Sequence, residues 1–453
     1  GASELLLSFT AAWEHMPLHR RLATFKHLVQ TLGEGEALFA VIAMLVERYR
    51  QDNTLPAFVK ELCNACKVDT QLQAVRQYLN LIQEACKPRR PVADAILGFG
   101  DKNPEQVKES IVVLFDGLPI ILANPGLRKR IATEMQKSEE AAEEVRKVYG
   151  DILERIVSFS STRPGKGGVD VQDPRIAAAN ERALEALLGL MPTEEFIEAS
   201  AGLMQTGSEA VRTRVFTSLT ERVGSAKQSN MALRAVFIDA LPNCTAFLVA
   251  SQPISVRRAA IECVDGIAEK YGKLDRAACA DAAEVVASDA ALGTAEGGLR
   301  VTSLLCLSSM VESLAEDMLG LTPVVLDKAL GFLEGSDAKE VGEMRDAVFT
   351  FLNALLDTLP FTLSATYLDR AIIAAAKSVE TDGERVWAVQ QFSTLAAKKI
   401  AFPELTTALS RVWETVAQTG AEAVLLCVEM LQQGIKTHTK AMVTRHAATL
   451  FPT

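Results

Sequence analysis

Residues 17–49, PLHRRLATFKHLVQTLGEGEALFAVIAMLVERY, determine how this chain folds. Pro17 ends the preceding helix, because proline lacks an amide hydrogen and its ring clashes one turn back. Apolar residues then recur at alternating spacings of four and three, which places them on one helix face. These residues are Leu18, Leu22, Phe25, Val29 and Leu32. Arg20 and His27 point away from that face, so the pattern predicts an amphipathic helix.

The segment then continues into another helix. Gly33 and Gly35 end the first stripe. A following stripe consists of Leu38, Val41, Leu45 and Tyr49, and an earlier one of Leu5, Leu6, Phe9, Ala12 and Trp13. Strand-like alternation is sustained nowhere in the chain, so the sequence predicts an all-α fold.

Helix pairs of this kind recur and carry two marks. Proline stands at or near the start of one helix, and a valine–arginine step opens some second helices. The prolines are Pro192, Pro242, Pro323, Pro360 and Pro403, and the steps are Val211-Arg212 and Val256-Arg257. Equivalent marks lie 45 (211 to 256), 37 (323 to 360) and 43 (360 to 403) residues apart. HEAT and armadillo pairs repeat every roughly 40–47 residues. The spacing predicts an α-solenoid of stacked HEAT/armadillo-like helix pairs.

One low-complexity stretch interrupts the helical pattern. Residues 160–173 begin SSTRPGKGGVD, which cannot bury apolar area and predicts a flexible loop. We expect it to separate an N-terminal helical-repeat block, residues 1–159, from a C-terminal HEAT-repeat block, residues 174–453.

Composition narrows the class of protein. The 453 residues are 49% hydrophobic but only 6% aromatic, which suits close-packed helices lined by aliphatic side chains. No stretch approaches about 20 uninterrupted apolar residues, so no membrane span is predicted.

The net charge of −10 argues against broad wrapping of nucleic acid. Because Gly1-Ala2-Ser3 lacks a methionine, we expect a cloning scar or an internal cut.

No catalytic motif emerges from the sequence. His15 and His19 are four residues apart, as in a zincin helix, but Pro17 lies between them. The glycine-rich run at residues 165–168 lacks the serine or threonine that follows the lysine of a P-loop. No Gly-x-Ser-x-Gly elbow is present. We therefore expect a protein that is not an enzyme, with neither catalytic nor cofactor-binding residues.

The cysteines favour buried thiols over a metal site. Cys63 and Cys66 form one close pair and Cys86 follows 20 residues later, but no fourth ligand is obvious nearby. A structural zinc site usually needs four ligands. An enzyme that uses Cys63 and Cys66 stays as a minor alternative, and the sequence predicts no metal.

Local basic clusters are the candidate contacts with RNA or an acidic partner, since they lie at expected turns or helix ends. They comprise Arg20, Arg21, Lys87, Arg89, Arg90, Arg128, Lys129, Arg130, Lys436 and Lys440. The Val256-Arg257-Arg258 step is different, because its arginines are expected to pair with acids of the neighbouring repeat.

Two segments resemble a known family. The first is Ala12-Trp13-Glu14-His15-Met16-Pro17-Leu18-His19-Arg20-Arg21-Leu22, and the second is Leu190-Met191-Pro192-Thr193-Glu194-Glu195-Phe196-Ile197. Both resemble the giant HEAT-repeat proteins of the small-subunit processome, which are U-three small nucleolar RNA-associated proteins of the UTP-A subcomplex. A weaker match follows at Leu359-Pro360-Phe361, and the order is kept along essentially the whole chain, as a C-terminal portion of such a protein.

The resemblance implies a nucleolar, non-enzymatic scaffold in early small-subunit ribosome biogenesis that supports pre-rRNA transcription and processing. Its implied partners are other UTP-A subunits (propeller and helical proteins) and, by association, the pre-ribosomal RNA leader and the small nucleolar RNP. Neither a membrane nor a small-molecule substrate is implied, and no cofactor. A karyopherin-like transport receptor, or another protein-binding solenoid, is the alternative. None of Trp13, Trp387 and Trp413 is followed by the asparagine expected of karyopherin repeats.

Overall fold

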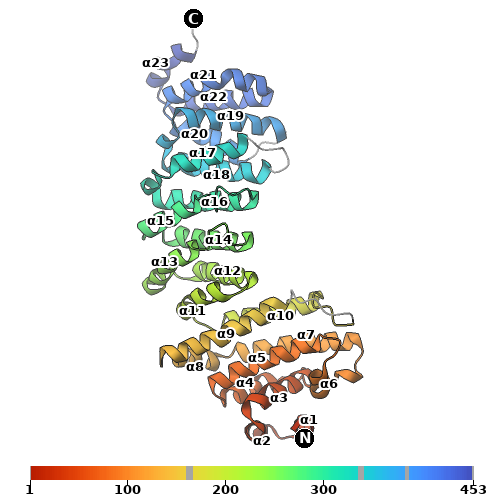
Figure 1. Cartoon of the computed structure of the whole chain (residues 1–453). Helices are drawn as coiled ribbons and strands as arrows, with labels where there is room; N and C mark the ends of the chain where they lie inside the picture. Colours follow the sequence, from red (N-terminus) through yellow and green to blue (C-terminus); the bar gives the residue numbers. More distant parts are fainter. Residues whose placement is uncertain (1, 160–166, 335–340, 383–386, 451–453) are drawn as a thin grey trace. The chain divides into compact units, whose positions relative to one another are not determined.

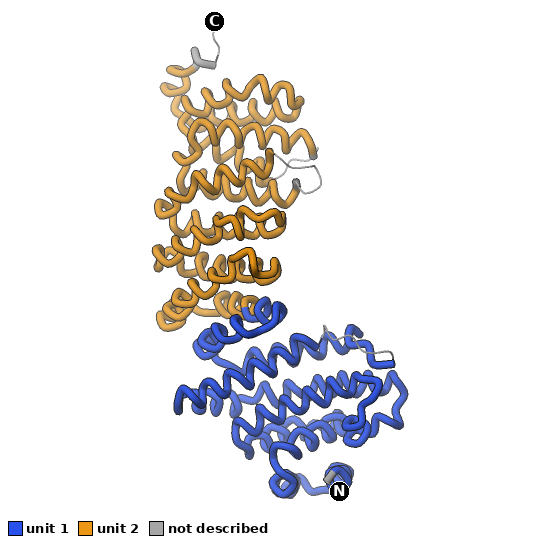
Figure 2. Tube along the Cα trace, in the orientation of Figure 1, with its two compact units in different colours: residues 1–215 blue, residues 216–453 orange. Residues whose placement is uncertain are grey.

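The computed structural model shows helices joined by turns, with no strand among the residues that it describes (Figure 1). The described residues are 2–159, 167–334, 341–382 and 387–450. They divide into two compact units, residues 1–215 and residues 216–453 (Figure 2). The predicted all-α fold of stacked helix pairs is confirmed.

The predicted boundary loop lies within the first unit. Its residues 160–166 are outside the described residues, and residues 167–173 lead into α10. The helices on its two sides, α9 and α10, pack against each other. The compact units divide between Val215 and Phe216. The division into blocks 1–159 and 174–453, separated by the loop, stays a prediction.

The first unit contains eleven described α-helices, two 3-10 turns and the start of α12. They are α1 (Ala2–Ala11), η1 (Trp13–His15), α2 (Leu18–Leu32), α3 (Glu34–Arg48), α4 (Leu55–Asn64), α5 (Val68–Ala85), α6 (Pro91–Leu97), η2 (Phe99–Asp101), α7 (Pro104–Leu122), α8 (Pro125–Met135), α9 (Glu139–Phe159), α10 (Pro174–Leu188), α11 (Thr193–Thr206) and α12 (Glu209–Ser225).

Buried aromatic rings hold the beginning of the first unit together. Trp13 is fully buried, and its ring meets those of Phe58 and Phe25 edge-on, with centroids 4.7 and 5.8 Å away. Gly33 joins α2 to α3 with a φ of 95°, a conformation that other residues rarely adopt. The predicted stripes are confirmed at Phe25 and Val29, which are buried. They are wrong at Leu18, in the first turn of α2, and at Leu5 of α1, which are 64% and 48% exposed.

Helix α7 interrupts the regular pairing of the first unit. The series α3, α5 and α9 packs in sequence, as second helices of stacked pairs do. By contrast, α7 packs against α3, α4, α5 and α10. It therefore packs beside this series and contacts helices of several successive pairs.

The second unit is more regular. Its elements are α13 (Met231–Thr245), α14 (Ile254–Tyr271), α15 (Arg276–Val286), α16 (Gly297–Leu314), η3 (Ala315–Met318), α17 (Thr322–Glu334), α18 (Val341–Thr358), η4 (Pro360–Thr362), α19 (Ala365–Asp382), α20 (Trp387–Lys399), α21 (Phe402–Thr419), α22 (Ala421–Thr437) and α23 (Lys440–Leu450). The even-numbered helices α14 to α22 form one row in which each packs on the next.

The repeat marks fall largely where the sequence predicts. Pro323 and Pro403 are second residues of α17 and α21, and Arg257 lies in the first turn of α14. Pro242 is an exception, because it lies inside α13, which already begins at Met231 with Asn230 as its cap. A proline near a helix end removes one backbone hydrogen bond without ending the helix.

Arginine side chains connect successive layers, though not always as predicted. Arg257 is buried and donates from Nη1 to the carbonyl oxygen of Ala290 at 2.7 Å, not to an acid. Acid pairing occurs elsewhere, where Arg276 of α15 donates to Asp317 of η3 at 2.6 Å.

No single described helix is long and apolar enough to cross a bilayer. Only α7 and α8 taken together satisfy both requirements, with a bend of 58° between them.

Candidate partner-binding cleft and basic clusters

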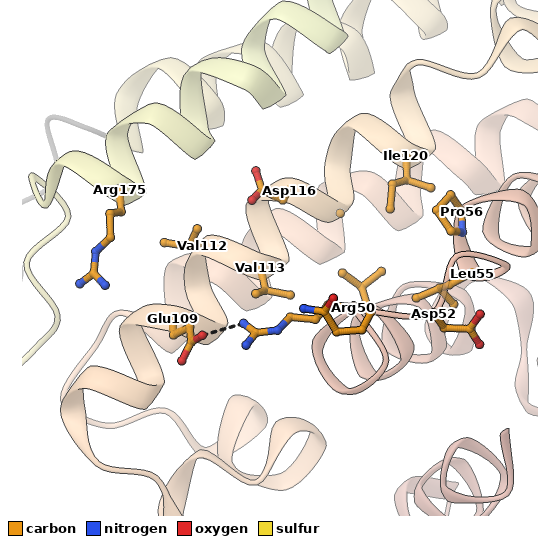
Figure 3. A pocket seen from close by; sticks show the side chains of 13 residues that line it. Arg50, Asp52, Leu55, Pro56, Glu109, Val112, Val113, Asp116, Ile120 and Arg175 are labelled. Atoms are coloured by element: carbon orange, nitrogen blue, oxygen red, sulfur yellow. Dashed lines mark ion pairs between the residues drawn. The ribbon is translucent and has the colours of Figure 1, made fainter. Parts of the chain in front are cut away.

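A cleft of about 530 Å³ opens along one face of α7 in the first unit (Figure 3). The end of α3 and the start of α4 form one wall, and the start of α10 forms the other. The lining residues of α7 run from Glu109 to Ile120 at helical spacing. These twelve residues span about 16 Å along the helix axis, so the cleft is about three helical turns long.

The floor of the cleft is apolar. It consists of Val46, Leu55, Pro56, Val112, Val113 and Ile120. Val112, Val113 and Ile120 are half-buried, so part of each aliphatic side chain faces the open cleft. Covering such side chains stabilises a complex by roughly 25 cal/mol per Å² of apolar surface removed from water.

Close helix packing forms this floor. A Cβ atom added to Gly117 would lie 2.6 Å from Oη of Tyr78 and 2.8 Å from Cγ1 of Val46. Only glycine therefore lets α7 approach α3 and α5 so closely. Tyr78 is buried, and its hydroxyl donates to the carbonyl oxygen of Leu114 at 2.9 Å.

The charged rim of the cleft is paired internally. Arg50 lies 2.8 Å from Glu109, and Asp116 accepts from Arg182 at 2.6 Å. Arg175 donates to Glu105 at 2.6 Å. Asp52 lies 3.5 Å from Arg21. Every charged side chain that lines the cleft, among the described residues, therefore has an oppositely charged partner.

Asp52 lies where the rim meets the buried aromatic rings. It accepts from the hydroxyl of Thr54 at 2.6 Å and from Nε1 of Trp13 at 2.7 Å. These hydrogen bonds, first that of Thr54, hold the pKa of its carboxyl below the usual value. Asp52 stays ionised near neutral pH, which makes it a structural acceptor and not a proton donor.

Three predicted contact residues instead stabilise the first unit. Arg21 is buried, with its guanidinium 4.0 Å from the Trp13 ring centroid and Nε donating to the carbonyl of Met16. Arg90 pairs with Asp94 at 3.2 Å, one turn into α6. The charged groups of Arg21 and Arg90 are therefore bound by other groups of the first unit.

Arg130 has a similar structural role. Its Nη1 donates to the carbonyl of Cys66 at 2.8 Å and its Nη2 to Oδ1 of Asn64 at 2.9 Å. These acceptors lie at the C-terminal end of α4, where backbone carbonyls lack helical partners.

The other seven predicted contacts have exposed side chains without an ion pair in the described part of the chain. They are Arg20, Lys87, Arg89, Arg128, Lys129, Lys436 and Lys440. Lys87 and Arg89 precede α6, whereas Arg128 and Lys129 lie on α8, at the opposite side of the first unit (Figure 1). Within the first unit the structure does not bring these two pairs into one surface. Contact of the seven residues with RNA or an acidic partner stays a prediction.

The cysteine pair lies in the interior. Cys63, Cys66 and Cys86 are buried. Burial raises the pKa of Cys63 to about 12 and that of Cys66 to about 11, so both thiols stay protonated. Across the described ranges, no three histidine, cysteine or acidic side chains are grouped to hold a metal ion.

The sequence reasoning missed the cleft. A signal was present in residues 107–122, VKESIVVLFDGLPIIL, where apolar residues face all sides of the helix. Such a helix packs on several neighbours, and the face left over is available to a partner.

Comparison with known proteins gives a consistent relationship. Residues 2–163 match the family model described as HEATR1-like, HEAT repeats. The chain is 33% identical over 459 residues to U3 small nucleolar RNA-associated protein 10 of Neurospora crassa, covering 99% of this chain and 25% of that protein. The protein of the same name from Neosartorya fischeri is 30% identical over 454 residues, with coverage of 99% and 25%. The chain thus spans about a quarter of the length of these relatives.

Solved structures give weaker similarities. An engineered protein has a TM-score of 0.47 at 13% identity, covering 99% of this chain and 98% of that one. Importin beta has a TM-score of 0.44 at 12% identity, with coverage of 96% and 53%. No functional conclusion follows from similarities this low. The chain is therefore a stack of HEAT-type helix pairs whose sequence is similar, over 99% of its length, to a portion of U3 small nucleolar RNA-associated protein 10.

Proposed function

We propose that this chain is a non-enzymatic scaffold in the early assembly of the small ribosomal subunit. The observation that carries the proposal is the similarity to U3 small nucleolar RNA-associated protein 10, which extends over 99% of the chain. The stacked helix pairs support the same role, because they expose an extended surface to partners.

The proposed setting is the nucleolus, within the UTP-A subcomplex of the small-subunit processome. There the chain supports pre-rRNA transcription and processing. Its direct partners are other UTP-A subunits, of propeller and helical type. The pre-ribosomal RNA leader and the small nucleolar RNP are partners by association.

Two features favour protein over RNA as the direct partner of this chain. The net charge is −10, and three of the ten candidate basic residues are used within the fold. The cleft along α7 has an apolar floor and a rim of paired charges, which suits a protein segment better than phosphate groups.

Deletion of these 453 residues from the parent gene tests the function. Pre-ribosomal particles are purified through a tagged UTP-A subunit from the deletion strain and from the unmodified strain. We expect U-three small nucleolar RNA and early pre-rRNA to be reduced in the deletion strain, because the scaffold no longer holds them.

The proposal would be contradicted by unchanged recovery of both RNAs in the deletion strain, with the shortened protein expressed at the normal level. Binding of the chain to the nuclear transport GTPase only in its GTP state would support the karyopherin-like alternative instead.

A further inference from the structure

The apolar cleft along α7 is poorly explained as a packing defect. Val112, Val113 and Ile120 lie on one face of a helix whose other faces contact α3, α5 and α10. The buried side chains of Val46 and Leu55 lie beneath this face. The half-buried aliphatic side chains of α7 and the exposed ring of Pro56 therefore line one hollow in the first unit.

The rim indicates the charge of the occupant. Arg50 and Arg175 are the lining cations, and they are held by Glu109 and Glu105 respectively. A phosphate would have to displace a carboxylate from each of them. The floor of the cleft therefore complements an apolar surface, and its two paired arginines are poorly placed to bind a nucleic-acid backbone.

The polar groups of the rim also indicate the conformation of the occupant. An extended peptide brings unpaired backbone amides and carbonyls, which are costly to bury without partners. Gln51 is the single uncharged polar side chain among the lining residues, and Pro56 has no amide hydrogen. A helix satisfies its own backbone hydrogen bonds, so it needs from the cleft only an apolar surface.

We propose that this cleft binds an amphipathic helix of a protein partner, about three turns long, which inserts aliphatic side chains at positions i, i+3 or i+4, and i+7. This inference rests on the proposed scaffold function, because it identifies the class of partner held by the first unit. Val112 and Val113 contact the inserted side chains, and the paired rim surrounds them.

A peptide selection with the full 453-residue chain tests the proposal. The probe is a phage-displayed library of helical peptides of about four turns, with a fixed polar face and a randomised opposite face. We expect enriched peptides to carry aliphatic residues at the stated spacing. Val113→Glu should weaken their binding by about tenfold or more, because it places a carboxylate on the apolar floor. Val324→Glu is the matched control, since Val324 is exposed on α17 outside the cleft, and it should leave binding unchanged.

Methyl NMR of the unsubstituted chain locates the bound peptide without depending on the folding of any variant. The enriched peptide should shift the methyl signals of Val112, Val113, Ile120 and Leu55. The proposal fails if no peptide is enriched, if Val113→Glu and Val324→Glu bind equally well, or if the shifts lie elsewhere. It also fails if a single-stranded oligouridylate shifts these methyls while the peptides do not. These outcomes concern the cleft alone, whereas recovery of U-three RNA in the deletion strain reports separately on the scaffold function.

Discussion

Arg411 on α21 holds Asp369 on α19 through two parallel hydrogen bonds, 2.7 Å from Nε and 2.8 Å from Nη2. The pair joins two layers of the second unit at its surface. Because Arg411 is more than a third exposed, water and salt screen the attraction. We expect a double-mutant cycle of Arg411→Ala and Asp369→Ala to give a coupling of less than about 1 kcal/mol. Urea unfolding at low and high salt measures it, and a coupling unaffected by salt would contradict this picture.

The burial of α2 predicts unequal losses along one helix. Phe25→Ala should reduce the free energy of unfolding by about 3–5 kcal/mol, because Phe25 is fully buried against Trp13 and Phe58. Leu22→Ala should cost less, since Leu22 is half-buried. Arg20→Ala, on the exposed face, should stay within about 0.5 kcal/mol. Denaturant melts of the three variants check the order, and equal losses would show that the helical phase is wrong.

Two arginines of α8 should behave differently. Arg130→Ala should destabilise the chain by about 1–3 kcal/mol, because acceptors at the end of α4 lose a charged donor. Arg128→Ala is the matched control and should be nearly neutral, as Arg128 is exposed. Thermal unfolding compares them. If Arg128→Ala instead lowers the affinity for RNA, the prediction for that cluster gains support.

Two helical glycines predict effects of opposite sign. Gly117→Ala should destabilise the chain by about 1–3 kcal/mol, since the new Cβ overlaps Tyr78 and Val46. Gly331→Ala, inside α17 with no atom within 4 Å of the new Cβ, should stabilise it by about 0.5–1 kcal/mol. Unfolding free energies of both variants decide the matter, and a stable Gly117→Ala protein would mean that α7 can move away from α3.

The ion pair of Arg234 and Asp275 predicts that the free energy of unfolding decreases at acidic pH. The hydrogen bond from Arg234 holds the pKa of the Asp275 carboxyl below its ordinary value of 3.8. On acidification the unfolded chain therefore binds its proton first, so this contribution is present above about pH 4 and is lost as the pH falls through the folded pKa. Asp275→Asn should lower stability at neutral pH, with a difference from the unsubstituted chain that shrinks toward about pH 3. Urea melts across this range test it, and a constant difference would contradict it.

The fold was predictable because local periodicity and repeat spacing reflect the same stacked helices. Phe25, Val29 and the Val256-Arg257 step illustrate this, since a residue's helical phase decides whether it is buried. Leu18 was not predictable, because exposure at a helix start depends on whether another helix covers it. Arg21 could have been found, as it lies four residues before Phe25 on the buried side of α2.

The cleft was predictable only in part, because residues 107–122 indicate an unusually apolar helix but not which helices pack around it. Arg50, Val113 and Arg175 come from helices far apart in the chain, and no local pattern specifies their approach. The basic clusters show the same limit, because Arg128 and Arg130 are two residues apart but only Arg130 meets the end of α4.

The packing of α7 outside the repeating series makes one part of the first unit different from the rest of the stack. A perfectly periodic stack presents the same binding site again in each successive layer, so a ligand can bind in several equivalent registers. Where an additional helix breaks the period, one binding site differs from all the others. A protein that settles there is fixed in position along the array, as an assembly with a defined order of parts requires.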